Sequence, residues 1–249
     1  MISITKIPQL KDNYSYAIKK NKDIIIIDPA ESISILKYIQ DNQFSLKSIL
    51  LTHHHTDHTG GVEDILNEIK VPVYSPNKKI KHTTIIVKDQ DTINLGIIDI
   101  KVIATPGHTM DHVIFYNKEN NILFSGDTLF RLGCGKVFEG TYEQMFSSLQ
   151  KINALNNITK VYCGHEYTDN NLNFLLSIFP KNKNILTEKK KIDLQLKETG
   201  SSIPFKLGKE KVLNPFLSPN SDCFKKFKNE NNLSDLMFFS HLRDMKNNF

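Results

Sequence analysis

Residues 52–61, with the sequence Thr-His-His-His-Thr-Asp-His-Thr-Gly-Gly, constrain this chain more than any other segment. The apolar run 49–52 comes directly before the histidines and is typical of a short buried strand. A helical pattern follows from 61 to 69. The histidines therefore lie on a strand-to-helix loop, and α/β proteins commonly bind ligands on such loops.

The spacing of the side chains in this segment suggests two metal ions. Successive side chains of an extended chain point to opposite faces, so His53 and His55 share one face while His54 points away. Asp57 and His58 follow where the chain turns toward the helix. They are better placed to bind a neighbouring ion than to crowd around the first.

Two simpler interpretations are a solvated polar loop and a single structural zinc site. Four His and one Asp within six positions argue against an accidental polar loop. Structural zinc sites are typically four-coordinate, closed and often rich in cysteine. Imidazole and carboxylate ligands around open positions are instead typical of hydrolytic sites.

Length and composition favour a soluble globular protein. A chain of 249 residues with 39% hydrophobic residues suits one large domain, or a main domain with an appendage. No apolar run approaches membrane-spanning length, and the first residues resemble a strand more than a signal or transit peptide. Cys134, Cys163 and Cys223 are widely separated, which argues against a disulfide framework. We expect a cytoplasmic protein in which Cys223 is a small buried residue.

Positive charge is concentrated in the C-terminal part of the chain. Residues 181–249 contain 14 Lys and Arg against 8 Asp and Glu, so the rest of this +5 chain is slightly acidic. A solvated lysine-rich surface is the plainest explanation, and a site for a small anionic substrate is the sharper one. Nucleic acid ranks third, because no basic and aromatic platform accompanies the charge.

The first half of the chain contains more strands than a simple βαβ alternation requires, which points to two sheets covered by helices. The strand-like runs are 14–18, 23–28, 49–52, 71–74, 84–87, 98–104, 113–116 and 122–125. The helical patterns are 32–40, 61–69, 141–155, 168–178, 185–197 and 233–246, with Ser234 as the N-cap of the last. Residues 204–219, rich in Pro and Gly, predict an extended connection.

Three further polar residues follow strand-like runs. His108 follows the run 98–104 in a turn dictated by Pro106 and Gly107, Asp127 follows 122–125, and His165 follows 161–163. Each alone is more often a turn residue or a cap than a ligand. Together with the first segment they complete a set of seven ligands suited to borderline-soft divalent ions: His53, His55, Asp57, His58, His108, Asp127 and His165.

Counting divides these ligands between two ions. The first ion can be held by His53, His55 and His108, and the second by Asp57, His58 and His165. Asp127 can bridge the pair, because its two oxygens can face in different directions. Two ions about 3.5 to 4 Å apart would lower the pKa of a shared water enough to give hydroxide near neutral pH. Asp57 and Asp127 are therefore also the candidate catalytic residues.

The remaining histidines have simpler expected roles. His112 follows His108 closely and is the best candidate for supporting a ligand from behind. Asp28, at the end of the run 23–28, could orient the histidine loop or simply end its strand. His54, His82 and His241 are expected to be surface residues or to support other residues from behind.

The ordered set of seven ligands resembles the metallo-β-lactamase superfamily and, within it, the glyoxalase II or hydroxyacylglutathione hydrolase family. The similarity covers nearly the whole chain. Its motifs are Asp12-Asn13-Tyr14, Asp28-Pro29, residues 52–61, Thr105-Pro106-Gly107-His108-Thr109, Gly126-Asp127-Thr128-Leu129-Phe130, Gly133-Cys134-Gly135-Lys136, residues 161–168, Asn214-Pro215-Phe216 and Arg243-x-x-Lys246.

The resemblance implies an α+β fold, namely a four-layer αββα sandwich with a C-terminal helical domain. Residues 1–167 would form the catalytic domain and residues 168–249 the substrate-binding domain. Matching positions would place five residues at the substrate: Lys136, Phe138, Tyr167, Arg243 and Lys246. The cationic side chains would bind the glycine carboxylate of glutathione, in agreement with the basic C-terminal part.

Two positions depart from the family pattern. Phe138 stands where the family commonly has tyrosine, so one hydroxyl contact to the peptide part of the substrate should be absent. Met110-Asp111 replaces the usual small residues before His112 and could bring an extra carboxylate near the first metal.

The implied activity is hydrolysis of S-lactoylglutathione to D-lactate and glutathione, a step of methylglyoxal detoxification. The metal-bridging hydroxide would attack the thioester carbonyl. A thiol with a pKa of about 8.5 can then leave without a strong general acid. The implied cofactors are two divalent ions, zinc first, with iron or manganese as alternatives. We expect a monomer with a small-molecule substrate and no nucleic acid or membrane partner.

Four rival functions remain to be weighed. The main one is a mononuclear iron persulfide dioxygenase acting on glutathione persulfide, which the Arg243-x-x-Lys246 tail and the segment 134–136 disfavour. A β-lactamase needs export and usually lacks the bridging Asp127, and a nuclease would need a broader basic surface. A metal-binding interaction protein without activity is disfavoured because all seven ligands are present.

Overall fold

The computed structural model describes residues 1–249, and its first half begins with a six-stranded mixed sheet. The strands lie in chain order: β1 (Ser3–Gln9), β2 (Asn13–Lys20), β3 (Asp23–Ile27), β4 (Ser45–Leu50), β5 (Val73–Ser75) and β6 (Ile85–Ile86). The first three strands are antiparallel. The pairs from β3 to β6 are parallel, so the carboxyl ends of these strands share one edge.

Both faces of this sheet are buried, and β3 shows how the sequence achieves this. Four consecutive isoleucines fill the strand, and their side chains alternate between faces. Ile24 and Ile26 belong to the core beneath α1 (Ile33–Asn42) and α3 (Val62–Glu68). Ile25 and Ile27 belong to the larger core shared with the second sheet. A strand buried on both faces is thus uniformly apolar.

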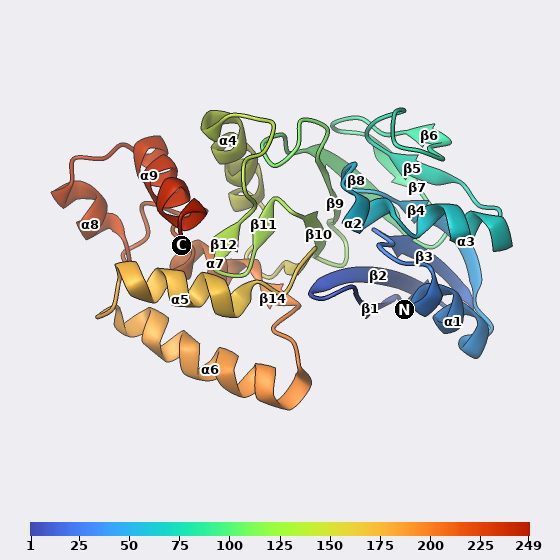
Figure 1. The fold of residues 1–249 in the computed structure, drawn as a ribbon, viewed down its shortest axis with the longest axis horizontal. Coiled ribbons are helices and arrows are strands. Elements are labelled where there is room, and N and C mark those ends of the chain that lie inside the picture. Colours follow the sequence, from blue (N-terminus) through green and yellow to red (C-terminus); the bar gives the residue numbers. More distant parts are fainter.

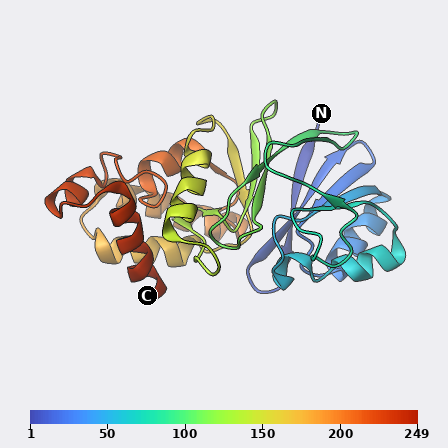
Figure 2. The same cartoon turned by 90° about the horizontal axis from the view of Figure 1, so that it is seen from above.

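The second sheet packs on the open face of the first, as Figures 1 and 2 show. Its spatial order is β14 (Phe205–Lys206), β13 (Lys160–Cys163), β10 (Ile122–Gly126), β9 (Val113–Asn117), β8 (Asp99–Ala104) and β7 (Thr92–Asn94). A small hairpin follows β10, formed by β11 (Leu129–Phe130) and β12 (Gly133–Cys134). Helix α4 (Tyr142–Asn153) covers the outer face, so the predicted αββα sandwich is confirmed.

The C-terminal part is mainly helical, as predicted. It contains α5 (Thr168–Ile178), α6 (Lys183–Thr199), α7 (Leu207–Leu213), α8 (Lys225–Glu230) and α9 (Asp235–Asn247). The Ser234 hydroxyl accepts a hydrogen bond from Met237 N at 3.2 Å, which confirms the predicted N-cap. Strand β14 lies within this part and pairs with β13 of the second sheet. The division at residues 167 and 168 therefore stays a prediction.

Two predictions about the C-terminal part were wrong, and one helix was not predicted. Residues 204–219 are not simply extended, because α7 lies among them. Its residues Leu207, Glu210 and Leu213 are buried at helical spacing. In the sequence this signal was weaker than that of the nearby prolines and glycine, which favour an extended connection. Helix α8 was missed because it is only six residues long. Cys223 is partly exposed rather than buried.

The ends of four strands converge where the two sheets meet. The histidine segment leaves β4 and forms α2 (Thr56–Thr59), while β8, β10 and β13 end nearby in the turns that carry the other candidate ligands. The turn between β1 and β2 closes this edge, since Tyr14 N donates to Gly164 O at 2.8 Å and Glu166 N donates to Asp12 O at 2.9 Å. None of the helices is both long and apolar enough to span a bilayer.

Candidate metal centre

Asp28 holds the histidine segment in place from the end of β3. Its Oδ1 accepts from Thr52 N at 2.8 Å and its Oδ2 from Thr52 Oγ1 at 2.7 Å. Oδ2 also lies 3.0 Å from His58 Nδ1. One buried carboxylate thus fixes both the start of the segment and the ring of His58, which supports the orienting role considered for Asp28.

Three imidazoles converge into a first cluster. His53 Nε2 lies 3.0 Å from His55 Nδ1, which in turn lies 3.1 Å from His108 Nε2. His108 Nδ1 faces the Lys136 carbonyl at 2.8 Å, which assigns the proton to Nδ1 and leaves Nε2 free to bind a metal. Nitrogen ligands around a tetrahedral zinc lie about 3.3 Å apart, so the cluster fits one ion.

A second cluster is formed by Asp57, His58 and His165. Asp57 Oδ2 lies 3.3 Å from His165 Nε2 and 3.9 Å from His58 Nε2. The other nitrogen of each ring is held by a carboxylate: His58 Nδ1 by Asp28 and His165 Nδ1 by Asp12, the latter at 2.8 Å. Both Nε2 atoms therefore face the same space.

Asp127 lies between the two clusters. Its Oδ1 is 3.3 Å from His58 Nε2, and its Oδ2 is 3.5 Å from His108 Nε2 and 3.3 Å from His165 Nε2. His58 Nε2 and Asp127 Oδ1 are buried without a hydrogen-bond partner of adequate geometry. Buried polar atoms are rarely left unpaired. A cation bound by these atoms would satisfy both, so the donor set fits a divalent metal site.

The electrostatics of the first cluster and of Asp127 agree with metal binding. Burial, together with the neighbouring imidazoles, holds the pKa of His53 well below its usual range, and burial also lowers the pKa of His108. Burial opposes ionisation of Asp127, but His58 and His165 outweigh it and hold its pKa well below the ordinary value. Neutral imidazoles and an ionised carboxylate are the forms that bind metals. In the second cluster burial lowers the pKa of His58 and His165, but Asp127 outweighs it and raises both, that of His165 to about 10, so a cation bound there would displace protons from these rings.

His112 supports the clusters from behind, as its spacing suggested. Its ring stacks on His53 with centroids 4.8 Å apart, and its Nε2 accepts from Asp127 N at 3.0 Å. Its Nδ1 lies 2.9 Å from Thr105 Oγ1. This neutral imidazole therefore fixes the backbone of the candidate bridging carboxylate.

The turn between β1 and β2 supplies support that reasoning from spacing missed. Asp12 binds His165 as described, and Asn13 Nδ2 donates to Asp57 Oδ2 at 3.0 Å. Asp12 and Asn13 entered the sequence analysis only as a motif of the family resemblance. Spacing carries no signal for these contacts, because hairpin and ligand lie far apart in the chain.

Gly164 allows the close approach of β13 to the clusters. A Cβ atom added there would lie 2.2 Å from Asp127 Oδ1 and 2.8 Å from His58 Cε1. Real Cβ atoms do not approach other atoms so closely, so any side chain at Gly164 would displace these two residues.

Asp111 does not join the first cluster. Its Oδ1 lies 2.9 Å from His54 Nδ1 and accepts from Thr109 Oγ1 at 2.8 Å. His54 Nε2 lies 3.3 Å from Glu139 Oε1. The extra carboxylate considered in the sequence analysis thus fastens His54, which points away from the clusters as predicted, to two neighbouring loops.

A cavity of about 530 Å³ opens directly over the clusters. Phe130, Phe138 and Tyr167 give it aromatic walls. The Phe138 ring lies edge-on to His55 and His108, with centroids 5.7 and 5.3 Å away, and the Tyr167 ring stacks on His165 at 4.6 Å. Phe138 is 59% exposed at the mouth of the cavity.

A second cavity of about 580 Å³ adjoins the first and shares Phe130, Lys136 and Tyr167 with it. Arg243 and Lys246 of α9 line it. Arg243 is only 5% exposed, and its Nη1 donates to Cys134 O at 3.0 Å. Lys246 Nζ donates to Asn170 O at 3.0 Å. Neither cation forms an ion pair with a carboxylate of the protein, so both positive charges remain available to an anion.

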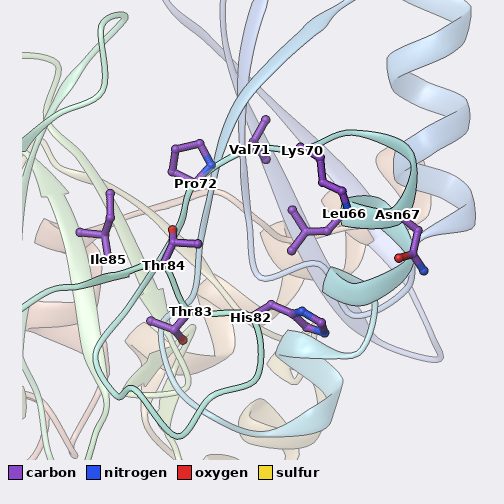
Figure 3. A pocket seen from close by; sticks show the side chains of 9 residues that line it. All are labelled: Leu66, Asn67, Lys70, Val71, Pro72, His82, Thr83, Thr84 and Ile85. Carbon is purple, nitrogen blue, oxygen red and sulfur yellow. The ribbon is translucent and has the colours of Figure 1, made fainter.

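A third cavity, of about 700 Å³, lies apart from this centre (Figure 3). It is formed beside α3 and β6, and none of the seven candidate ligands lines it. His82 lines this cavity, is partly buried and lies outside the clusters, in line with the minor role expected for it.

Comparison with known proteins covers the whole chain. The family model described as the metallo-beta-lactamase superfamily matches residues 10–165. The model described as the hydroxyacylglutathione hydrolase C-terminus matches residues 166–249. The first match contains all seven candidate ligands and the second contains Tyr167, Arg243 and Lys246.

Curated relatives and a solved structure agree with these matches. The hydroxyacylglutathione hydrolase of Psychromonas ingrahamii is 40% identical and aligns over 100% of both chains. That of Pelagibacter ubique is 42% identical over 96% of this chain and 97% of its own. ETHE1 from Myxococcus xanthus shares the fold, with a TM-score of 0.67 and 20% identity over 98% of this chain and 96% of that one. The chain therefore belongs to the hydroxyacylglutathione hydrolase family of the metallo-β-lactamase superfamily.

Proposed function

We propose that this protein hydrolyses S-2-hydroxyacylglutathione, with S-lactoylglutathione as the substrate and D-lactate and glutathione as products. The observation that carries the proposal is that the two ligand clusters, linked by Asp127, open into a cavity that adjoins a second cavity whose cations have no carboxylate partner. The first cavity suits an acyl group and the second suits an anionic carrier. S-lactoylglutathione is an isomer of the adduct that methylglyoxal forms with glutathione, so the same reaction would complete the detoxification of methylglyoxal.

Two divalent cations are the proposed cofactors. His53, His55 and His108 would hold the first, Asp57, His58 and His165 the second, and Asp127 would contact both. Such a pair supplies an activated water near neutral pH and polarises the carbonyl that the water attacks. Zinc is the first choice for this set of imidazoles and carboxylates, with iron and manganese as alternatives.

The residues of the chain position the reacting groups. Asp127 is anchored through its own N–H by His112, and Asp57 is anchored by Asn13, so the two carboxylates keep fixed positions at the floor of the cavity. The aromatic side chains of Phe130 and Tyr167 limit water around the thioester. The carbon–sulfur bond then breaks, and the thiolate leaves without an acid because the thiol pKa is about 8.5.

The carrier is bound by Arg243 and Lys246. A carboxylate entering the second cavity would find an almost buried guanidinium and a half-buried ammonium whose present partners are neutral oxygens. Both partners of the new hydrogen bonds would be charged, and hydrogen bonds between a cationic donor and a carboxylate are among the stronger ones in proteins. Lys136, which lines both cavities, would lie between the thioester and the carrier carboxylate.

The rival function is oxidation of a persulfide by a single iron. An enzyme of this kind would have the same fold but would need only one cluster. The second cluster is as fully built as the first, with supporting carboxylates on His58 and His165. This favours the hydrolase. A cytoplasmic location and a monomeric state remain part of the proposal.

The proposal is tested by comparing kcat/KM for S-lactoylglutathione with that for the lactoyl thioester of N-acetylcysteamine, which has the same acyl group on an uncharged thiol. We expect a strong preference for the glutathione ester, reduced about tenfold or more by Lys246→Ala and Arg243→Ala, since a charge-assisted hydrogen bond contributes roughly 1.5 to 3 kcal/mol. Lys225→Ala, at an exposed lysine on α8, is the matched control. Indifference of the wild-type protein to the carrier would refute the proposal.

A further inference from the structure

Lys11 brings a further positive charge to the carrier cavity from the other end of the chain. It lies in the turn between β1 and β2 and lines the same 580 Å³ cavity as Arg243 and Lys246. Its ammonium group makes no hydrogen bond or ion pair with the protein, and the residue is exposed. An exposed lysine of this kind is usually just solvated. Whether Lys11 can bind an anion depends on the other charged groups of the cavity.

The carboxylates of the cavity have hydrogen-bond partners within the protein, whereas its cations have no acidic partners. Asp12 holds His165 at 2.8 Å, and Asp169 accepts from Asn173 at 3.2 Å. Glu166 accepts from Ser202 N at 2.7 Å and from the Ser202 hydroxyl at 2.6 Å. All three carboxylates that line the cavity therefore have partners within the protein. Its cations do not have acidic partners, which leaves Lys11 available to an anionic ligand.

The backbone around Lys11 is held on both sides. Leu10 N donates to Glu31 Oε2 at 2.9 Å, and the Asp12 carbonyl accepts from Glu166 N at 2.9 Å. The Asp12 side chain is fixed on His165 as well. Binding through Lys11 would thus order only its side chain, which keeps the entropic cost small compared with ordering a loop.

We propose that Lys11 binds the second carboxylate of the carrier, that of the γ-glutamyl group, while Arg243 and Lys246 bind the glycine carboxylate. The inference rests on the proposed function, because it takes glutathione as the carrier. Glutathione has a carboxylate at each end, and cations from the β1–β2 turn and from α9 line one cavity. Lys11 would then select a carrier with two carboxylates over one that lacks the γ-glutamyl group.

The test measures binding separately from hydrolysis. Two non-hydrolysable ligands are compared by calorimetry: S-methylglutathione and S-methyl-N-acetylcysteinylglycine, which keeps the glycine carboxylate but lacks the γ-glutamyl carboxylate. The Kd of each is measured for the metal-loaded wild type, for Lys11→Gln and for the control Lys20→Gln. Lys20 is an exposed lysine at the end of β2 and does not line the cavity.

We expect Lys11→Gln to weaken the binding of S-methylglutathione about 3- to 20-fold, an effect between that of an exposed ion pair and that of a strong charge-assisted hydrogen bond. The truncated ligand should bind the variant and the wild type equally, and Lys20→Gln should change neither Kd. Equal effects of Lys11→Gln on both ligands, or no effect on either, would overturn the role of Lys11. Discrimination between the ligands without hydrolysis of S-lactoylglutathione would support Lys11 and refute the proposed function.

Discussion

Asp12 Oδ1 lies 2.8 Å from His165 Nδ1, although the two residues are 153 positions apart in the chain. The contact fixes the ring so that Nε2 faces Asp57 and Asp127. The first hairpin is therefore part of the candidate metal centre, although none of the candidate ligands lies on it.

Asp12→Ala should weaken the second metal site selectively. Without its carboxylate partner the His165 ring loses both its orientation and part of its basicity, which typically reduces metal affinity about 10- to 100-fold. Titration with zinc in the presence of a competing chelator resolves the two affinities. The first site should stay within threefold of wild type. Equal weakening at both sites would show that Asp12 acts on the fold as a whole.

Gly164→Ala should disrupt both clusters without unfolding the protein. The new Cβ would lie 2.2 Å from Asp127 Oδ1, so the carboxylate must move away from the imidazoles that it joins. Gly96→Ala is the control, because a Cβ there meets nothing within 4 Å and only the positive φ of 78° opposes it. Bound metal per chain and far-ultraviolet circular dichroism are measured for both variants. Full metal content in Gly164→Ala would contradict the geometry.

Lys246 should make carrier binding depend on pH in the alkaline range. Burial, and then the charge of Arg243, lower the pKa of Lys246 from 10.5 to about 8. The charged form attracts the carrier carboxylate, so affinity should be full below pH 8 and fall as the pH rises through that value. The Kd of S-methyl-N-acetylcysteinylglycine between pH 7 and 9.5 reports this titration. In Lys246→Arg, whose guanidinium stays charged, the dependence should disappear.

Glu210 should make folding stability fall with rising pH. Burial raises its pKa from 4.5 to about 7, although Leu132 N and Asn214 donate to it. Between these values the unfolded chain has lost the proton and the folded chain has kept it, so stability decreases as the pH rises through the folded pKa. The full shift corresponds to roughly 3 kcal/mol. Urea unfolding of Glu210→Gln at pH 5 and pH 8 should therefore show a smaller difference than the wild type, and an equal difference would contradict the assignment.

The sequence was sufficient to predict much of the fold and the gathering of the seven candidate ligands at one edge, for physical reasons. Strands buried on both faces must be apolar throughout, so β3 and β9 stand out, and turns after strands expose their His and Asp residues at one edge. Alternation in an extended segment correctly separated His54 from His53. These signals are local, and each depends on a few neighbouring residues.

What could not be predicted depends on contacts between distant residues. The pairing of β14 with β13 and the hydrogen bond of Arg243 to Cys134 O join segments that no periodicity connects. Asp111 could be expected near the first cluster, but its side chain lies beside His54 instead, with Oδ1 2.9 Å from His54 Nδ1. Helix α7 was not predicted, because Pro204 and Gly208 favour an extended connection and only three of its positions are buried.

We propose that Asp127 joins two metal sites. The most direct measurement is the amount of metal bound per chain, determined by elemental analysis of protein purified without added chelator and again after reconstitution with zinc. We expect two divalent ions per chain in the wild type and loss of thioester hydrolysis when both are removed. A saturating value of one ion per chain, with hydrolysis intact, would contradict it.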